Sequence, residues 1–369
     1  MIFLLSFFFS SCGNLLHKSH SIQDDKQFRK TENKNFNGEK ALTQWWYFDF
    51  FFDDGSVLVL MFVPHHWWTD PESEEDANTL IYVSYLNADG ELVKSEKIVH
   101  SSEIQYDENG LKSPYLEILK SHDKKSREYT INFFLDEIQG TAKITSDAKA
   151  FSPLPTGSMG PFGTRHILKK GKNLAYRYAA HVPQGEATVN LDINDIHYNL
   201  SGKAYNEQGW FSGQAHQMGD GWVWFHFVSE NINLFGARSF FFLEMNDEIL
   251  IGGLNSSKSR CVVKDSVMSV FNPNFLMGAG LSFESSKLSL DVTHTGASNV
   301  RLIYIPSDHT DQVWGTVLQP SKIILQYKGQ EIIETGRMLI ETSGMKRIIS
   351  SNNPVITKEL KSDDKRWRD

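Results

Sequence analysis

The stretch QWWYFDF at residues 44–50 returns as GWVWFHF at residues 221–227, with tryptophan, an aromatic residue and two phenylalanines at identical spacing. Each copy is rich in residues that favour strands and stands at the start of a predicted strand pair. A second echo relates GKAYNE at 202–207 to GRMLIE at 336–341, with Gly, a basic residue, an apolar residue and Glu in register. Because the two echoes occur in the same order, the sequence predicts two halves that open and close alike.

Short apolar runs separated by turn-forming residues recur along the chain. Asp, Asn and Gly dominate the separators because they tolerate the positive φ angles of tight reversals. Long helical stretches are missing, so we expect an all-β protein. Closing each half into an antiparallel β-barrel would leave no sheet edge exposed and would create an interior cavity. The runs of the first half are residues 45–52, 56–63, 80–86, 92–99 and 129–135.

The length of 369 residues exceeds what one hydrophobic core usually serves. We place two tandem domains at residues 40–214 and 215–346, followed by a polar tail at 347–369. The segment 151–162 is rich in Pro and Gly and cannot lie inside a sheet. It is expected to form a loop that could act as a lid.

The N-terminus has the pattern of a bacterial lipoprotein signal. Residues 1–11 are mostly apolar and end in small residues before Cys12. Cleavage there would leave a lipid-bearing cysteine that ties a polar tether, residues 12–39, to the cell envelope, at the outer membrane or cell surface. A simple secretory signal or a plain apolar segment stays open, because no Lys or Arg precedes the run and Phe9 fits the motif poorly.

Charge and cysteine content exclude several roles. The formal net charge is −8 and basic residues are scattered except in the tail, so no nucleic-acid binding is expected. No stretch after the N-terminus is apolar for long enough to cross a bilayer. If Cys12 is lipidated, only Cys261 remains and no intramolecular disulfide can form. We expect a monomer that an N-terminal lipid anchor holds to a membrane.

Glu207 is the first candidate for chemistry. A carboxyl group buried among aromatic side chains has its charged form disfavoured, so it can stay protonated and donate to an alkene or carbonyl. Tyr205 would lie on the same face of the strand because side chains alternate with a period of two. The alternative is structural, with Glu207 pairing with Lys203 or Arg337 at a barrel end.

Aromatic side chains are the candidates for ligand binding. Tryptophan ring faces can stabilise a carbocation, an interaction worth up to about 2 kcal/mol when it is dry. The alternative is that these rings fill the core. The expected ligand is a lipid or another apolar small molecule. The candidate residues are Trp46, Tyr47, Trp210, Trp222 and Trp224.

Two histidines complete the set. His181 is a candidate proton carrier in catalysis and His226 a candidate ligand-binding residue, although either could be an ordinary strand histidine. His65 and His66 are adjacent and would point to opposite faces of a strand, so no metal site is expected. The sequence also has no nucleophile elbow and no Gly-rich phosphate loop, which argues against hydrolase or kinase chemistry. No organic cofactor is expected.

Residues 44–49, 205–210 and 221–225 resemble the lipocalin-like superfamily that contains carotenoid 1,2-hydratases and tocopherol cyclases. The resemblance implies two lipocalin-like barrels that protonate or orient polyprenoid or polyketide chains. It places Glu207 at the acidic position of the central motif, with Tyr205 on one side and Trp210 on the other.

The sequence also departs from the pattern of that superfamily. Asn206 and Gln208 stand beside Glu207, where hydratase-type motifs carry His and Asp. Phe211 replaces a small residue, and Gln44 stands where an acidic residue is common. These changes fit either a different substrate or a protein that binds without turnover.

Two functions follow as hypotheses. The first is a cofactor-independent, acid-assisted isomerase, cyclase or hydratase of a prenyl-type or other long apolar substrate. The second is a non-catalytic envelope lipoprotein that carries a lipid or pigment. A third, an adhesion module, would instead show an exposed aromatic patch.

Overall fold

A computed structural model describes the strand regions of the chain. The signal, tether, tail, residues 151–162, Cys12, His65 and His66 lie outside the described residues. The described residues are 43–63, 78–106, 110–121, 127–146, 176–211, 221–230, 233–241, 244–245, 249–254, 259–263, 267–271, 280–284, 288–305, 313–327 and 330–343.

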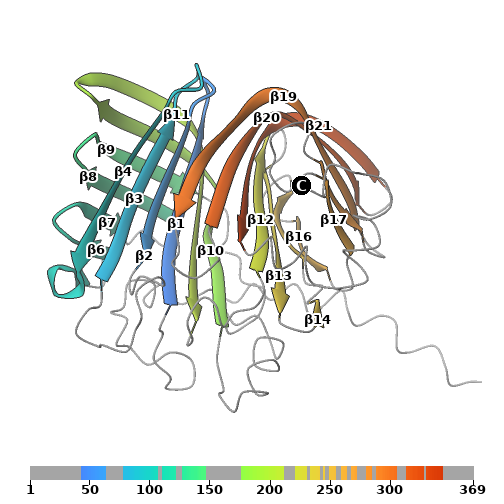
Figure 1. Ribbon diagram of the computed structural model, residues 1–369, viewed down its shortest axis with the longest axis horizontal. Coiled ribbons are helices and arrows are strands. Elements are labelled where there is room, and N and C mark those ends of the chain that lie inside the picture. The colour runs from blue at the N-terminus through green and yellow to red at the C-terminus, as the bar shows by residue number, and fades with distance from the viewer. Residues whose placement is uncertain are drawn as a thin grey trace, which may run out of the picture.

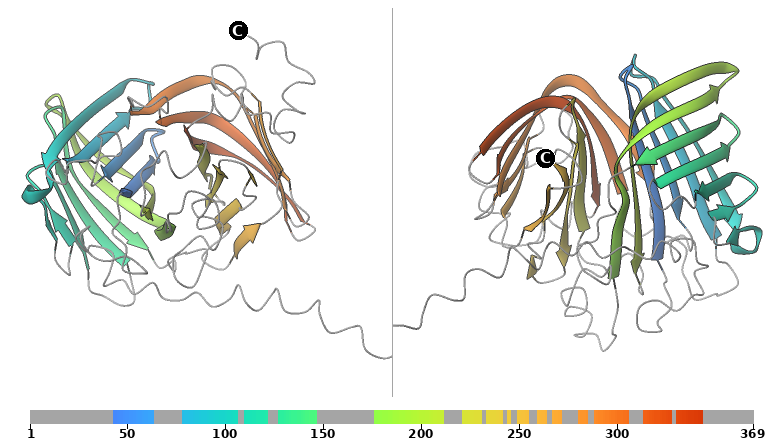
Figure 2. Two further views of the ribbon diagram at one scale, coloured as in Figure 1. Left: turned by 60° about the horizontal axis from the view of Figure 1, so that its bottom comes forward. Right: turned by 180° about the vertical axis from the view of Figure 1, so that it is seen from behind.

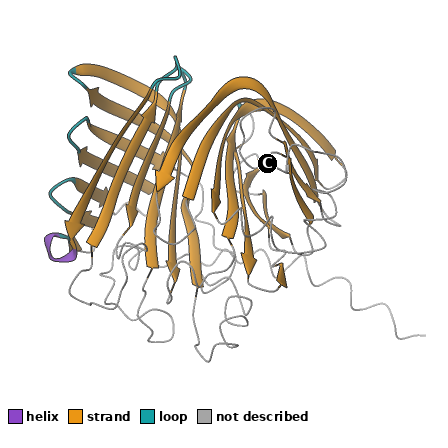
Figure 3. Cartoon of the chain, viewed as in Figure 1, coloured by secondary structure: helices purple, strands orange, loops and turns teal. Residues whose placement is uncertain are grey.

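The described chain is nearly all β, as the sequence predicted (Figure 3). Among these residues the only helical segment is the short 3-10 turn η2, Ser101–Glu103. The first sheet contains β1 (Thr43–Phe52), β2 (Val57–Val63), β3 (Asn78–Leu86), β4 (Leu92–His100), β5 (Gln105–Tyr106), β6 (Gly110–Lys112), β7 (Leu116–Lys120), β8 (Arg127–Phe134), β9 (Ile138–Ser146), β10 (Tyr176–Ile193) and β11 (Ile196–Phe211). The second contains β12 (Gly221–Val228), β13 (Asn233–Phe241), β14 (Glu244–Met245), β15 (Ile249–Leu254), β16 (Ser259–Val263), β17 (Val267–Phe271), β18 (Gly280–Glu284), β19 (Leu288–Ile305), β20 (Val313–Tyr327) and β21 (Gln330–Ser343).

Both sheets have the same topology. The order β4-β3-β2-β1-β11-β10-β9-β8-β7 in the first sheet corresponds to β16-β15-β13-β12-β21-β20-β19-β18-β17 in the second. In each, the opening strand pairs with the next strand on one side and with the closing strand on the other. Register is conserved as well, because Tyr47 lies opposite Glu207 as Trp224 lies opposite Glu341. The two sequence echoes therefore mark equivalent strand pairs.

Each sheet curls over its own concave face (Figure 1; Figure 2). The strand path of the first sheet has two ends, β4 and β5, and among the described residues they do not pair with one another. The described strands therefore confirm the expected all-β architecture, with each half formed by a curled antiparallel sheet. The apolar cluster inside the first curl joins residues of β1 to β3 with residues of β7 to β11, so packing holds the curl together.

Strand β1 serves two cores because its side chains alternate between two faces. Trp46, Phe48 and Phe50 point into the first curl, where all three are fully buried. Tyr47 and Phe51 belong to a second cluster, which includes Trp224, Phe235 and Leu339 of the second sheet. The face of β1 that would otherwise be the outside of a barrel is thus the contact between the halves.

Glycines occupy matched positions in the two halves, whereas the nearby proline bulges differ in register. A Cβ on Gly202 would lie 2.2 Å from the carbonyl oxygen of Phe51, and a Cβ on Gly336 would lie 2.2 Å from that of Val228. Gly202 therefore lets β11 approach β1 closely, and Gly336 lets β21 approach β12 closely. The strand next to each closing strand bulges near Pro183 in β10 and Pro320 in β20, where the missing N–H of proline disrupts the ladder least.

Candidate functional site

A buried layer of polar and aromatic side chains lies where β1 and β11 of the first sheet face β12 of the second. These side chains come in pairs two residues apart, so each pair projects from one face of its strand. All are at most 7% exposed. This junction layer consists of Tyr47 and Asp49 on β1, Tyr205 and Glu207 on β11, and Trp224 and His226 on β12.

Glu207 holds hydrogen bonds at both carboxyl oxygens. The phenol of Tyr205 donates to Oε2 over 2.6 Å, and the indole N–H of Trp45 donates to Oε1 over 3.1 Å. An N–H can only donate, so Oε1 acts as an acceptor whether or not Glu207 is protonated. Both oxygens of the Glu207 carboxyl are therefore held in place, one by a phenol and one by an indole.

Gly209 makes room for the indole that fixes this carboxyl. Trp45 and Gly209 are cross-strand partners, and a Cβ on Gly209 would lie 2.0 Å from Cζ2 of the ring. Any larger residue would push the indole away. The glycine two residues after Glu207 is thus part of the site's construction.

Asp49 and His226 join the two sheets directly. Nδ1 of His226 lies 2.7 Å from Oδ1 of Asp49, and its Nε2 lies 2.8 Å from Oδ1 of Asn233. Nδ2 of Asn233 has no hydrogen-bond partner. The amide can therefore present its oxygen to an imidazolium or, turned over, its nitrogen to a neutral imidazole. His226 is therefore held at both ring nitrogens, by one residue from each sheet.

Aromatic rings enclose these polar groups. Trp224 contacts Tyr47 with ring centroids 5.1 Å apart and Tyr205 at 5.6 Å. Tyr205 also contacts His226 at 5.0 Å and Phe235 at 4.9 Å. Rings from both halves thus meet around the phenol that bonds Glu207, and their faces can stabilise positive charge.

Burial and charge shift two pKa values in the layer. Desolvation raises the pKa of Tyr47 well above its ordinary value, and the charges of Asp49, Glu341 and Glu207 add to the rise. Desolvation also raises the pKa of Asp49, an effect that His226 partly offsets. Three carboxyl groups therefore act on one phenol. Tyr47 and Asp49 also act on one another through a side-chain hydrogen bond, whereas Nε1 of Trp224 is buried without a hydrogen-bond partner.

His181 lies on the other face of the first sheet. Its Nε2 is 3.1 Å from Oε1 of Gln208, which follows Glu207 on β11 and so projects from the opposite face. Trp46 also projects into the first curl, where its ring contacts Phe62 at 5.2 Å. The structure therefore separates His181 and Trp46 from the pair Tyr205 and Glu207.

The structural alternative for Glu207 named Lys203 and Arg337 as partners. Lys203 instead pairs with Glu186 at the surface. Arg337 crosses to the first half, where it donates to the carbonyl of Ser56 over 3.2 Å and its guanidinium lies 5.3 Å from the Phe51 ring centroid. The two basic residues are thus engaged elsewhere.

Two of the expected tryptophans are described by their backbone alone. The backbone of Trp210 belongs to β11 and that of Trp222 to β12, but their side chains lie outside the described residues. Within the described part of the chain, no cluster of three or more metal-ligating side chains is found. No described helix is long and apolar enough to span a membrane.

Sequence reasoning missed three residues of the site, Trp45, Asp49 and Asn233. A signal for the first two existed, because Trp45 aligns with Trp222 and Asp49 aligns with His226 in the repeated stretch. Asn233 carried no signal, since it becomes a partner only when β13 pairs with β12.

Comparisons with solved structures identify the architecture. A crystal structure of a Nitrosomonas europaea protein described as AttH is similar over 82% of this chain and 93% of its own, with a TM-score of 0.58 and 13% identity. Kievitone hydratase from Nectria haematococca is similar over 87% of this chain and 94% of its own, with a TM-score of 0.54 and 10% identity. The fold is lipocalin-like. No protein-family model and no curated protein matches the sequence.

Proposed function

We propose that the protein is a cofactor-independent, acid-assisted hydratase, cyclase or isomerase that acts on a long apolar, prenyl-type substrate at the junction layer. The observation that carries the proposal is the buried pair of Tyr205 and Glu207, held at 2.6 Å among rings from both halves. A similar fold in kievitone hydratase is consistent with this class of reaction.

The chemistry follows from the contacts. Protonated Glu207 transfers its Oε2 proton to an alkene carbon, which leaves a carboxylate and a carbocation. The Tyr205 hydroxyl and the Trp45 indole N–H then stabilise the carboxylate by hydrogen bonds. Faces of Trp224 and Tyr205 shield the cation from bulk water. Water addition gives hydration, internal alkene attack gives cyclisation, and loss of a neighbouring proton gives isomerisation.

The experiment follows the transferred proton. Lipid extract of the source cells is incubated with purified protein in deuterated water, and carbon-bound deuterium is read by mass spectrometry. Wild type should label a lipid, and Glu207→Gln should lower the labelling rate by about 10²- to 10⁴-fold. A wild-type protein that labels nothing rules out acid catalysis.

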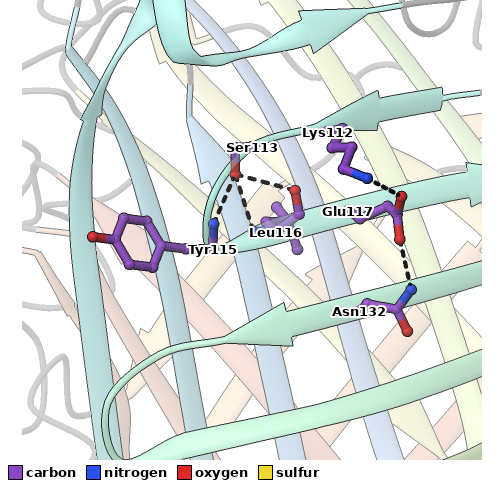
Figure 4. A network of polar contacts seen from close by, with 6 residues as sticks. All are labelled: Lys112, Ser113, Tyr115, Leu116, Glu117 and Asn132. Carbon is purple, nitrogen blue, oxygen red and sulfur yellow. Dashed lines mark hydrogen bonds and ion pairs between the residues drawn. The ribbon is translucent and has the colours of Figure 1, made fainter.

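Glu117→Gln is the matched control (Figure 4). Glu117 lies on β7 of the same sheet, 3.4 Å from Nζ of Lys112, and accepts a hydrogen bond from Asn132 over 2.8 Å. The change removes one carboxylate without touching the junction layer. Labelling by this variant should equal that of wild type.

The second candidate function is a carrier of lipid or pigment. The buried indole N–H of Trp224, which has no hydrogen-bond partner, favours it, since this group can hold a polar end of a ligand without any reaction. Native mass spectrometry with lipid extraction decides between the two. An apolar ligand recovered unaltered from both wild type and Glu207→Gln indicates a carrier.

We further propose that the protein is a lipoprotein of the bacterial envelope, anchored through Cys12. The apolar run before that residue supports this placement. Metabolic labelling with a palmitate analogue should mark wild type and leave Cys12→Ser unmarked. Equal labelling of both would contradict the anchor.

A further inference from the structure

We infer that Glu341, which lies across from Trp224 of the junction layer, is a second catalytic carboxyl group and acts as the base that takes a proton from the attacking water. This inference rests on the proposed function. Glu341 of the second half would serve as the base of the hydration, and Glu207 of the first half would serve as its acid.

The position of Glu341 repeats that of Glu207. Glu207 lies directly across from Tyr47 on one side and Ala180 on the other. Glu341 lies across from Trp224 on one side and Gly315 on the other. Each carboxyl thus has a ring on one flank and a small residue on the other, in equivalent strand positions.

Both carboxyl groups face the same layer. Residues directly opposite each other in an antiparallel pair project from the same face, so Glu341 shares the face of Trp224. At Trp224 that face is buried against the first sheet, where Trp224 contacts Tyr47 at 5.1 Å, and Glu341 is half-buried beside it. The ring pair of Tyr47 and Trp224 is therefore flanked by one carboxyl from each half. The effect of both charges on the Tyr47 phenol agrees with this placement.

Two carboxyl groups suit a hydration. Glu207 gives its Oε2 proton to one alkene carbon, and the oxygen of a water molecule forms a bond to the resulting cation. Glu341 accepts the proton that this water loses, so the alkene and water together yield the alcohol. Proton exchange with solvent then returns both groups to their starting states. The indole N–H of Trp224 has no hydrogen-bond partner and can donate to the water oxygen.

The test separates protonation from hydration. Wild type, Glu207→Gln, Glu341→Gln and Glu341→Asp are compared in deuterated water with the source-cell lipid extract and with farnesol as a defined isoprenoid probe. We expect Glu207→Gln to lose both deuterium incorporation and alcohol formation. Glu341→Gln should keep deuterium incorporation within about twofold, yet lose alcohol formation by about 10²-fold or more. Glu341→Asp should restore part of the hydration.

The outcomes distinguish the two proposals. If wild type neither incorporates deuterium nor forms alcohol, the proposed function fails. If wild type forms alcohol and Glu341→Gln forms it at the same rate, only the role of Glu341 fails. Equal loss of deuterium incorporation and alcohol formation in Glu341→Gln would also overturn that role. Urea unfolding of the same variants checks that each is folded.

Discussion

Asp49 and His226 occupy equivalent positions in the two halves, and their side chains bond to one another across the sheet junction at 2.7 Å. Both are fully buried. Removing one partner of such a buried pair leaves the other without compensation, which typically costs about 3–5 kcal/mol.

Asp49→Asn and His226→Gln should therefore each lower the free energy of unfolding by about 3 kcal/mol. The double variant should lose less than the two single losses combined, because the second change removes the group that the first left unsatisfied. Urea unfolding of all four proteins gives the coupling energy. Simple additivity would show that the contact does not join the halves energetically.

The pH dependence of this pair has a definite sign. Burial raises the pKa of Asp49 above its ordinary 3.8, so the folded state holds the proton to higher pH than the unfolded state. The part of the stability that comes from this raised pKa is then fully present below pH 3.8 and is lost as pH rises through the folded pKa. The stability advantage of wild type over Asp49→Asn should shrink over this interval. A growing advantage in urea unfolding from pH 4 upward would contradict it.

Gly209→Ala tests the placement of the Trp45 indole. The added methyl group occupies the space of the ring, so we expect a loss of about 1–3 kcal/mol in unfolding free energy and of the hydrogen bond to Glu207. Trp45→Phe is the comparison, since it removes the N–H but keeps an aromatic ring. Gly209→Ala and Trp45→Phe should both slow deuterium labelling. Only Gly209→Ala should show the expected loss in unfolding free energy.

Gly202→Ala and Gly336→Ala should damage the two halves alike. Each methyl group would meet a backbone carbonyl 2.2 Å away, and backbone cannot move aside as a flexible side chain can. We expect each to cost about 3 kcal/mol or more. Gly90→Ala is the control, because nothing lies within 4 Å and only its φ of +89° is unfavourable, a cost of about 1 kcal/mol. Unequal losses at the two matched glycines would contradict the equivalence.

Sequence predicted most of the β architecture, because alternating runs and turn residues act locally. The two internal repeats also marked the equivalent strand pairs, since residues 202–207 and 336–341 each lie on the strand that pairs with the opening strand of their half. The strand order of each sheet was not predicted, because it depends on which strands pair at long range. His181 was grouped with Glu207 although it bonds Gln208 on the other face. A register shift next to it in β10 defeats simple alternation.

Pairing between the halves was beyond sequence reasoning. Asp49 and His226 align in the repeat, but an alignment does not say that the two copies face each other. The sequence marked Glu341 only as the last residue of the repeated segment 336–341 and gave it no role. Its place beside Trp224 depends on the register of β21 against β12.

The buried contact between the sheets limits how modular the two halves can be. Each half supplies one member of the Asp49 and His226 pair and part of the ring cluster. An isolated half would expose its aromatic side chains to solvent, together with Asp49 or His226 without its partner. If one half were replaced by that of a relative, the new half would therefore have to supply residues that match those of the half that is kept. The whole chain should also unfold in one cooperative transition.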